Sequence, residues 1–294
     1  MDRLAVAEVR AFNRTVAERI GALTDEFLGR QRPMGESRIL WEIGEAGLEV
    51  RELRSRLGLD SGYTTRVLQS LGEQGLITVK ASSGDRRVRH VRLTAAGQRE
   101  RAELDQLSDG VAWAFLEPLD QGQRDRLVKA MGEVERLLRA SLVRLAVEDP
   151  AGADARWCVG QYFAELNSRF DAGFDPAGSI PADAHELVPP AGAFVIARLK
   201  ERPIGCGALK LHPGEPAELK RMWVSPDSRG LGVGRRLLVE LERLAKEGGA
   251  RTAQLETNRT LKEAIQLYRE SGYHEVKPFN SEPYAHHWFE KDLL

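Results

Sequence analysis

Residues 229–240 read RGLGVGRRLLVE, in which every second position from Gly230 to Gly234 is glycine and an apolar run with helical spacing follows. Glycine lets a ligand approach the backbone without meeting a Cβ atom, and the N-terminus of a helix attracts an anion. The stretch therefore predicts a loop that wraps an anionic group and leads into a helix. The glycines alone leave two alternatives open, a tight turn that binds nothing and a dinucleotide-binding loop, for which Glu256 lies near the required distance.

The whole sequence has 294 residues, a length that suits two domains, and its 42% hydrophobic and 30% charged residues are typical of packed globular proteins. No stretch approaches the roughly 20 apolar residues of a membrane span, and the charged N-terminus lacks the apolar segment of a secretory signal. Cys158 and Cys206 are the only cysteines, which argues against a disulfide framework. We expect a cytoplasmic protein that has no membrane partner.

Helical patterns dominate the first half of the chain, residues 1–147. Apolar side chains recur at intervals of three and four over residues 4–28, which predicts one long amphipathic helix. Shorter helices are expected over residues 37–47 and 49–59, and the periodicity of residues 96–145 predicts further helices. These patterns indicate a mainly α-helical first domain.

Within residues 60–77 the pattern predicts a helix with an exposed polar face, which Asp60 or Ser61 can cap and Gly75 ends before an extended start at Leu76 and Ile77. Such a face suits a recognition helix in the major groove of DNA. Apolar and basic residues then alternate over 78–94 around a turn at SSGD, which predicts a two-stranded hairpin. Its arginine-rich tip fits the negative potential of a narrow minor groove. Residues 49–92 carry nine basic and five acidic residues, a net charge of +4 that forms a modest basic patch.

Residues 61–97, SGYTTRVLQSLGEQGLITVKASSGDRRVRHVRLTAAG, resemble the winged helix-turn-helix of the MarR family of regulators. The resemblance implies a DNA-binding homodimer whose first and last helices interleave, and a pseudo-palindromic operator in double-stranded DNA. It also implies that Asp85 orders the wing. Two of the implied contacts have structural alternatives, because Arg66 could pair with an acid on its own helix and Tyr63 could pack against a neighbouring helix. The implied DNA contacts are Ser61, Tyr63, Thr64, Thr65, Arg66, Arg86 and Arg87.

Alternating strand and helix patterns follow in the second half, residues 148–294, after a linker-like EDPAGADA segment. This alternation predicts an α/β domain with a mixed sheet. The expected elements are a strand over 156–160, a helix over 161–170, two strands within 193–212, a strand over 217–224, the loop and helix of 229–240, a strand over 252–257, a helix over 261–272 and two closing strands.

RMWVSPDSRGLGVGRRLL (residues 221–238), followed by LETN (255–258) and AIQLYRESGY (264–273), resembles the GNAT family of acetyl-CoA-dependent N-acetyltransferases. Three residues of the first segment match the family's R/Q-x-x-G-x-G loop, which holds the pyrophosphate of coenzyme A. The resemblance implies a GNAT acyltransferase fold with acetyl-CoA as cofactor. The implied cofactor contacts are Met222, Val224, Arg229, Gly230, Gly232, Gly234, Arg235 and Asn258.

Two catalytic residues follow from the same resemblance. Tyr268 matches the tyrosine that protonates the departing thiolate, and its alternative is simple packing on the inner face of its helix. Glu218 lies eleven residues before Arg229, at the position of a general base in many family members. On a regular strand Glu218 would share a face with Met222, and its alternative is a salt bridge with a neighbouring lysine or arginine.

Substrate selection is expected to fall to four side chains and to the loop over residues 171–185. His286 could act as a base or an anchor, although strand histidines are often only packed or solvated. No Cys or His cluster has metal-ligand spacing, so no metal is assigned. The four expected substrate residues are Tyr162, Glu165, Arg169 and His286.

Three functions are compatible with these patterns. The first is a transcription regulator fused to an N-acetyltransferase that acts on a small primary amine, such as an amino acid, a drug or a toxic metabolite. The second is a non-catalytic sensor in which acetyl-CoA or an amine controls DNA binding. The third keeps the enzyme and treats the first half as a dimerisation scaffold, and turnover and DNA binding distinguish the three.

Overall fold

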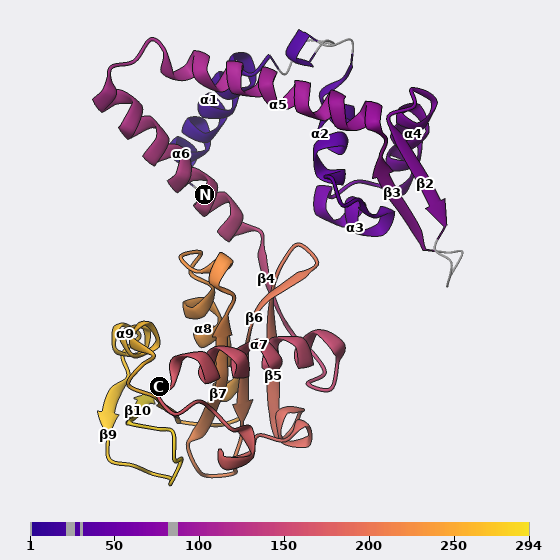
Figure 1. The fold of residues 1–294 in the computed structure, drawn as a ribbon. Coiled ribbons are helices and arrows are strands. Elements are labelled where there is room, and N and C mark those ends of the chain that lie inside the picture. Colours follow the sequence, from indigo (N-terminus) through magenta and orange to yellow (C-terminus); the bar gives the residue numbers. More distant parts are fainter. Residues whose placement is uncertain (1, 22–26, 30–31, 82–87, 294) are drawn as a thin grey trace. The chain divides into compact units, whose positions relative to one another are not determined.

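The chain divides into two compact units, Met1–Met131 and Gly132–Leu294. Figure 1 shows the fold as a computed structural model. Within the described ranges, no helix is both long and apolar enough to span a membrane. The residues that the structure describes are 2–21, 27–29, 32–81 and 88–293.

Helices surround a small sheet in the first unit (Figure 1). The first helix is shorter than the predicted span of 4–28, because Gly21 adopts a φ of 66° directly after it, a conformation that ends helices. The last helix continues into the second unit. The elements are α1 (Arg3–Arg19), η1 (Phe27–Gly29), α2 (Met34–Ile43), β1 (Leu48–Glu49), α3 (Val50–Leu57), α4 (Ser61–Glu73), β2 (Ile77–Ala81), β3 (Arg89–Leu93), α5 (Ala95–Leu116) and α6 (Gln121–Ser141).

The predicted recognition helix is α4, and its first turn is capped as expected. The Asp60 side chain accepts a hydrogen bond from the Tyr63 N–H at 2.9 Å. Val67, Leu68 and Leu71 are buried on the inner face of α4 and join the core of the first unit. This packing fixes which face of the helix remains exposed.

The small sheet has the strand order β1-β3-β2 and is antiparallel. Strands β2 and β3 confirm the predicted hairpin, while the short β1 adds a third strand that the sequence pattern did not predict. The predicted turn at SSGD, with Asp85, Arg86 and Arg87, lies outside the described residues.

A seven-stranded sheet forms the centre of the second unit, in the order β4-β5-β6-β7-β8-β10-β9. β7 and β8 pair in parallel, and the other neighbours pair antiparallel. This arrangement confirms the predicted mixed sheet. The elements are β4 (Val143–Val147), α7 (Ala153–Arg169), η2 (Pro176–Gly178), η3 (Ala184–Leu187), β5 (Gly192–Leu199), β6 (Arg202–Lys210), β7 (Ala217–Val224), η4 (Pro226–Ser228), α8 (Val233–Glu247), β8 (Thr252–Thr257), α9 (Lys262–Glu270), β9 (His274–Val276) and β10 (His287–Asp292).

Two expectations for the start of this unit were wrong. Residues 156–160 are helical rather than extended, because they belong to α7, where Ala155, Cys158 and Leu166 are buried at helical intervals. Residues 143–147 form strand β4, although the periodicity over 96–145 predicted helix. β4 pairs with the apolar β5 and buries Val143, so this pairing overrides the local pattern. The second unit therefore begins before the predicted boundary at residue 147.

The central sheet is covered on both faces. Val195 and Ala197 of β5 pack in one core with the apolar side of α8. Phe194 and Ile196 pack in the other core with α7, which crosses the sheet in Figure 1. β5 is therefore buried on both sides, as expected for a central strand flanked by helices.

Candidate functional site

Strands β7 and β8 separate after a short paired segment. Their parallel pairing covers only Ala217–Glu218 and Ala253–Gln254, although both strands continue beyond it. Two adjoining cavities open where the strands diverge, one of about 690 Å³ and one of about 280 Å³. The residues that line both cavities are Tyr162, Leu166, Met222, Leu261, Ala264 and Tyr268.

The glycine loop lines the larger cavity. Gly230 and Gly232 have φ values of 80° and 71°, in the left-handed region that favours glycine. Helix α8 begins at Val233 with no side-chain cap and no acidic residue in its first turn. The loop therefore offers backbone N–H donors and a positive helix end, which fit an anionic diphosphate. This agrees with the predicted chemistry of the RGLGVG stretch.

Glu165 lies beside this loop rather than in the predicted substrate site. Arg229 Nη2 lies 2.7 and 2.6 Å from the two Glu165 carboxylate oxygens. The carboxylate also accepts hydrogen bonds from Trp223 Nε1 at 3.0 Å and from Arg169 Nη1 at 3.3 Å. Arg169 in turn donates to the Thr260 carbonyl at 2.8 Å. Glu165 and Arg169 thus line the larger cavity and not the smaller one.

Most of the predicted cofactor residues meet around the larger cavity. Asn258 is the exception, because it lines the smaller cavity at the end of β8. Its Nδ2 donates to the Tyr284 carbonyl at 2.7 Å and its Oδ1 accepts from the Thr260 N–H at 3.0 Å, so both ends of the amide are already bonded within the protein. The predicted cofactor residues that line the larger cavity are Met222, Val224, Arg229, Gly230, Gly232, Gly234 and Arg235.

Tyr268 stands where the two cavities meet. Tyr268 is 6% exposed, and the centroid of its ring lies 5.9 Å from that of Tyr273 and 6.0 Å from that of Phe289. Burial, with a further contribution from Glu256, raises the pKa of the Tyr268 phenol above its usual value. The phenol therefore keeps its proton at neutral pH and suits a proton donor. The packing and catalytic interpretations of Tyr268 are compatible.

Glu218 does not reach either cavity. The prediction that it shares a strand face with Met222 was wrong, because β7 contains a bulge. Cys206 pairs with Trp223 and Ala208 pairs with Lys220, so one residue of β6 faces two of β7 and the alternation shifts. Glu218 instead lies 3.3 Å from Lys220 Nζ and 3.5 Å from His212 Nε2, which matches its salt-bridge alternative.

Two buried or half-buried carboxylates that sequence reasoning missed as site residues line the smaller cavity. Glu256, near the end of β8, pairs with Lys220 Nζ and accepts a hydrogen bond from Asn280 Nδ2 at 3.3 Å. Glu282 lies in the loop before β10. Glu256 could have been identified as a site residue from its place in LETN, close to Asn258. Nothing in the sequence around Glu282 indicated that it belongs to the site.

Aromatic rings form a wall of the smaller cavity. The ring centroid of Phe174 lies 5.4 Å from that of Phe163 and 4.9 Å from that of Tyr284. The ring centroid of Phe170 lies 5.8 Å from those of both Phe174 and Tyr284. Tyr162 joins the wall, with its ring centroid 5.6 Å from that of Phe163, and lines both cavities. Its role in binding the substrate stays a prediction. Burial raises the pKa of its phenol.

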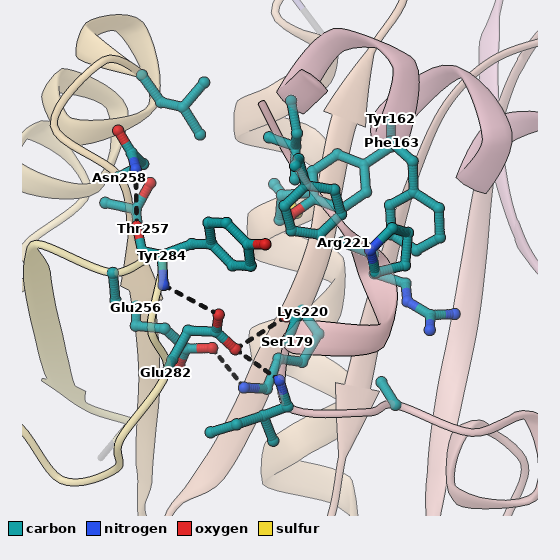
Figure 2. Close-up of a pocket in the computed structure, with 18 of the residues that line it drawn as sticks. Tyr162, Phe163, Ser179, Lys220, Arg221, Glu256, Thr257, Asn258, Glu282 and Tyr284 are labelled. Atoms are coloured by element: carbon teal, nitrogen blue, oxygen red, sulfur yellow. Dashed lines mark hydrogen bonds and ion pairs between the residues drawn. The ribbon is translucent and has the colours of Figure 1, made fainter. Parts of the chain in front are cut away.

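Figure 2 shows how the groups of the smaller cavity are divided. Glu256, Glu282 and Tyr284 lie on one side, and Phe163 and Arg221 lie on the other. The predicted substrate residue His286 lines neither cavity. Its side chain is exposed, in the loop just before β10, which starts at His287. In the described part of the chain, no group of acids, histidines or cysteines could hold a metal ion.

The exposed face of α4 carries part of the predicted DNA contacts. Ser61, Thr65 and Arg66 are exposed, and the Arg66 side chain makes no ion pair with any described residue. Thr64 is 1% exposed and its Oγ1 donates to the Asp60 carbonyl at 2.8 Å, so its prediction as a DNA contact was wrong. A Cβ placed on Gly35 would lie 2.1 Å from Tyr63 Oη, so Tyr63 packs against α2.

Comparison with known families matches both halves of the chain. Residues 28–88 match the MarR family, and residues 161–273 match the acetyltransferase (GNAT) family. The chain joins a MarR-family domain to a GNAT acetyltransferase domain. As a GNAT domain, the second half is an acetyl-CoA-dependent N-acetyltransferase.

Two curated relatives each match about a third of this chain. The IAA acetyltransferase of Azospirillum brasilense is 38% identical over 104 residues, which are 35% of this chain and 67% of that protein. The N-acetyltransferase C1271.07c of Schizosaccharomyces pombe is 35% identical over 98 residues, which are 32% of this chain and 60% of that protein.

Two solved structures are similar to about half of this chain each. A GNAT-family acetyltransferase from Staphylococcus aureus Mu50 has 18% identity and a TM-score of 0.45, and the match covers 52% of this chain and 99% of that one. FabT of Streptococcus pneumoniae, solved in complex with DNA, has 18% identity and a TM-score of 0.36, and the match covers 46% of this chain and 95% of that one.

Proposed function

We propose that the GNAT domain of this chain acetylates a small primary amine and that its MarR domain is a transcription regulator. The observation that carries the catalytic part is the position of Tyr268 between an anion-binding loop and a cavity lined by carboxylates and aromatic rings. Acetyl-CoA binds in the larger cavity, and the amine binds in the smaller one.

Acetyl-CoA supplies an acetyl thioester at the junction of the two cavities. The N–H groups of the loop around Gly232 bind the diphosphate, and α8 adds the partial positive charge of its N-terminus. The unpaired edge of β7 at Met222 and Val224 binds the pantetheine arm as an added strand would. These residues would hold acetyl-CoA in the cavity that Tyr268 also lines.

Acetyl transfer requires two proton movements. The new N–C bond forms while the C–S bond breaks, so the amine must lose a proton and the departing sulfur must gain one. The Tyr268 O–H donates to the sulfur, for which its burial and raised pKa keep it protonated. Glu256 takes the proton of the amine, because its carboxylate lines the amine cavity that Tyr268 also lines.

The first experiment measures acetyl-CoA-dependent thiol release by the full-length chain with a panel of amino acids, polyamines and aminoglycosides. Turnover of one amine class, depressed in Tyr268→Phe, is the expected result. Calorimetric titration with acetyl-CoA runs in parallel. Tight binding of acetyl-CoA with no turnover of any amine would replace this proposal by the alternative of a non-catalytic sensor.

For the regulator, we infer that the exposed face of α4 enters the major groove of a pseudo-palindromic operator. Its support is that Ser61, Thr65 and Arg66 lie exposed near the N-terminus of α4, where recognition helices contact base edges. The test measures binding of the chain to its own upstream DNA by fluorescence anisotropy. Arg66→Ala should weaken binding, whereas Arg38→Ala, an exposed arginine of α2 that pairs with Glu42, should not. Failure of the unaltered chain to bind would favour the scaffold alternative.

A homodimer accompanies this proposal. Helix α1 has no buried residue, yet it exposes Leu4 at 79%, Val9 at 59% and Phe12 at 48%. An apolar face of this size on a soluble surface marks an interaction site, and two copies would bury it. Sedimentation of the full-length chain gives the oligomeric state directly, and a monomer at micromolar concentration would contradict the dimer.

A further inference from the structure

Arg221 is a cation that lines the smaller cavity and forms no ion pair with a described residue, and the carboxylates of Asp183 and Glu186 act on it only at longer range. Lys220 also lines this cavity, but Glu218 and Glu256 pair with it. Among the described residues, the Arg221 guanidinium makes no ion pair, and its contact is the face of the Phe163 ring at 5.7 Å. Burial lowers the pKa of this guanidinium, which reflects the cost of its unpaired charge. Such a position suits an anion that a ligand supplies.

The backbone at Arg221 gives the same indication. Arg221 has a φ of 54°, which is uncommon for a residue other than glycine. Strained conformations of this kind persist where the surrounding structure fixes them, and they cluster at ligand-binding sites. Here the bulge of β7 holds Arg221 at the cavity.

Glu282 is the opposite case, an anion without a cation. Its carboxylate accepts hydrogen bonds from Ser179 Oγ at 2.9 Å, from the Ile180 N–H at 2.7 Å and from the Tyr284 N–H at 3.3 Å. All three donors are neutral, and no positively charged group of the described chain pairs with it. Figure 2 shows Glu282 and Arg221 on opposite sides of the cavity. After Lys220 and Glu256 neutralise each other, Arg221 is left as the unpaired cation of this cavity, and Glu282 and Asp183 are left as its carboxylates without an ion pair.

We propose that the acceptor amine is an aromatic amino acid, with Arg221 as the residue that selects its carboxylate. Glu282 faces the ammonium group, and the rings of Phe163, Phe170 and Phe174 pack against the aromatic side chain. The cavity of about 280 Å³ is near the lower end of small-molecule pockets, which suits a ligand of this size. This inference rests on the proposed acetyl transfer to an amine.

Matched substrates test the inference on the unaltered chain. Phenylalanine carries all three groups, phenethylamine lacks the carboxylate and alanine lacks the ring. We expect kcat/KM for phenylalanine to exceed that for phenethylamine by about tenfold or more, since a charge-assisted hydrogen bond is lost. Alanine should also be a poor substrate. Equal kcat/KM for phenylalanine and phenethylamine would overturn the inference and leave the proposed acetyl transfer intact.

Variants of Arg221 test the residue itself. In Arg221→Gln the ratio of kcat/KM between phenylalanine and phenethylamine should fall towards one, and Arg221→Lys should keep part of it. Glutamine and lysine are as disfavoured at a positive φ as arginine is, so these substitutions do not change the backbone strain at position 221. Arg243→Gln, on the outer face of α8 where Arg243 pairs with Glu240, is the control and should keep the full ratio. An unchanged ratio in Arg221→Gln would contradict the role of Arg221.

Calorimetric binding measurements test the recognition of an aromatic amino acid independently of the proposed acetyl transfer. The full-length chain is titrated with phenylalanine, phenethylamine and 3-phenylpropanoate in the presence of coenzyme A. Phenylalanine should bind more tightly than either analogue, whether or not any amine is turned over. Binding of this kind without turnover would support the recognition of an aromatic amino acid and refute catalysis. No preference for phenylalanine in either assay would refute the recognition.

Discussion

Glu165→Gln tests how the cofactor loop is held before it meets its ligand. Both carboxylate oxygens of Glu165 accept hydrogen bonds from Arg229 Nη2, and the carboxylate also accepts hydrogen bonds from Trp223 and Arg169. Its carboxylate therefore neutralises an arginine in the cavity that is proposed to hold a diphosphate. The carboxylate and the diphosphate compete for the same guanidinium.

The expected effect is modest, because solvent reaches the pair. The Glu165 side chain is 18% exposed and that of Arg229 is 43% exposed, and pairs of this kind contribute about 0.5–1 kcal/mol. Glutamine keeps a carbonyl oxygen for Trp223 Nε1–H but loses the negative charge. Arg229 then pairs with the diphosphate without breaking an ion pair, so acetyl-CoA should bind about 1 kcal/mol more tightly, or roughly fivefold.

Calorimetric titration of the full-length chain with acetyl-CoA measures this change in Kd. Glu240→Gln is the matched control, because it removes a carboxylate of α8 that pairs with Arg243 and lines neither cavity. Its Kd should equal that of the unaltered chain. Unchanged or weaker binding in Glu165→Gln would refute the reasoning, since it would mean that Glu165 orients Arg229 towards the ligand.

Four further outcomes are expected. Because burial raises the pKa of Tyr268 above its usual value of 10, kcat should not fall with rising pH up to about pH 9, as pH–rate measurements will show. Gly232→Ala should lower the free energy of unfolding by about 1–2 kcal/mol, and with it the Tm, because alanine disfavours the φ of 71°. Gly234→Ala should lower the Tm less, because Gly234 has no positive φ. Arg66→Ala should reduce the salt dependence of DNA binding, with the slope of log K falling by about 1 if Arg66 contacts a phosphate. Val9→Asp should shift the sedimentation of the chain towards a monomer, because it places a charge on the exposed apolar face of α1.

The sequence was most informative where a function depends on local backbone geometry. The alternating glycines of residues 229–234 predicted both the loop and the start of α8, because the left-handed φ of Gly230 and Gly232 requires glycine. The cap of α4 at Asp60 was predictable for the same reason, since a cap is made within one turn. Both features are determined by residues that are adjacent in the sequence, so they can be predicted from it.

Features that depend on distant pairing were not predictable in this way. β4 is a strand because β5 offers it a partner about 50 residues away, and its own sequence continues a helical pattern. Glu282 reaches the smaller cavity because its carboxylate binds Ser179 and the Ile180 N–H, in a loop about 100 residues earlier. No periodicity over a short window encodes either contact.

One β-bulge connects the prediction that failed on β7 with the residue that we propose for specificity. Gly207 faces two residues, Arg221 and Met222, so the side-chain alternation of β7 shifts by one position. The shift turns Met222 towards the core that contains α8 and leaves Glu218 on the same face as Lys220, where it pairs with Lys220 and lines neither cavity. It also brings Arg221 to the smaller cavity with a positive φ. Bulges redirect side chains beside active sites, so the irregularity that misplaced a predicted base is itself evidence that Arg221 has a role in binding.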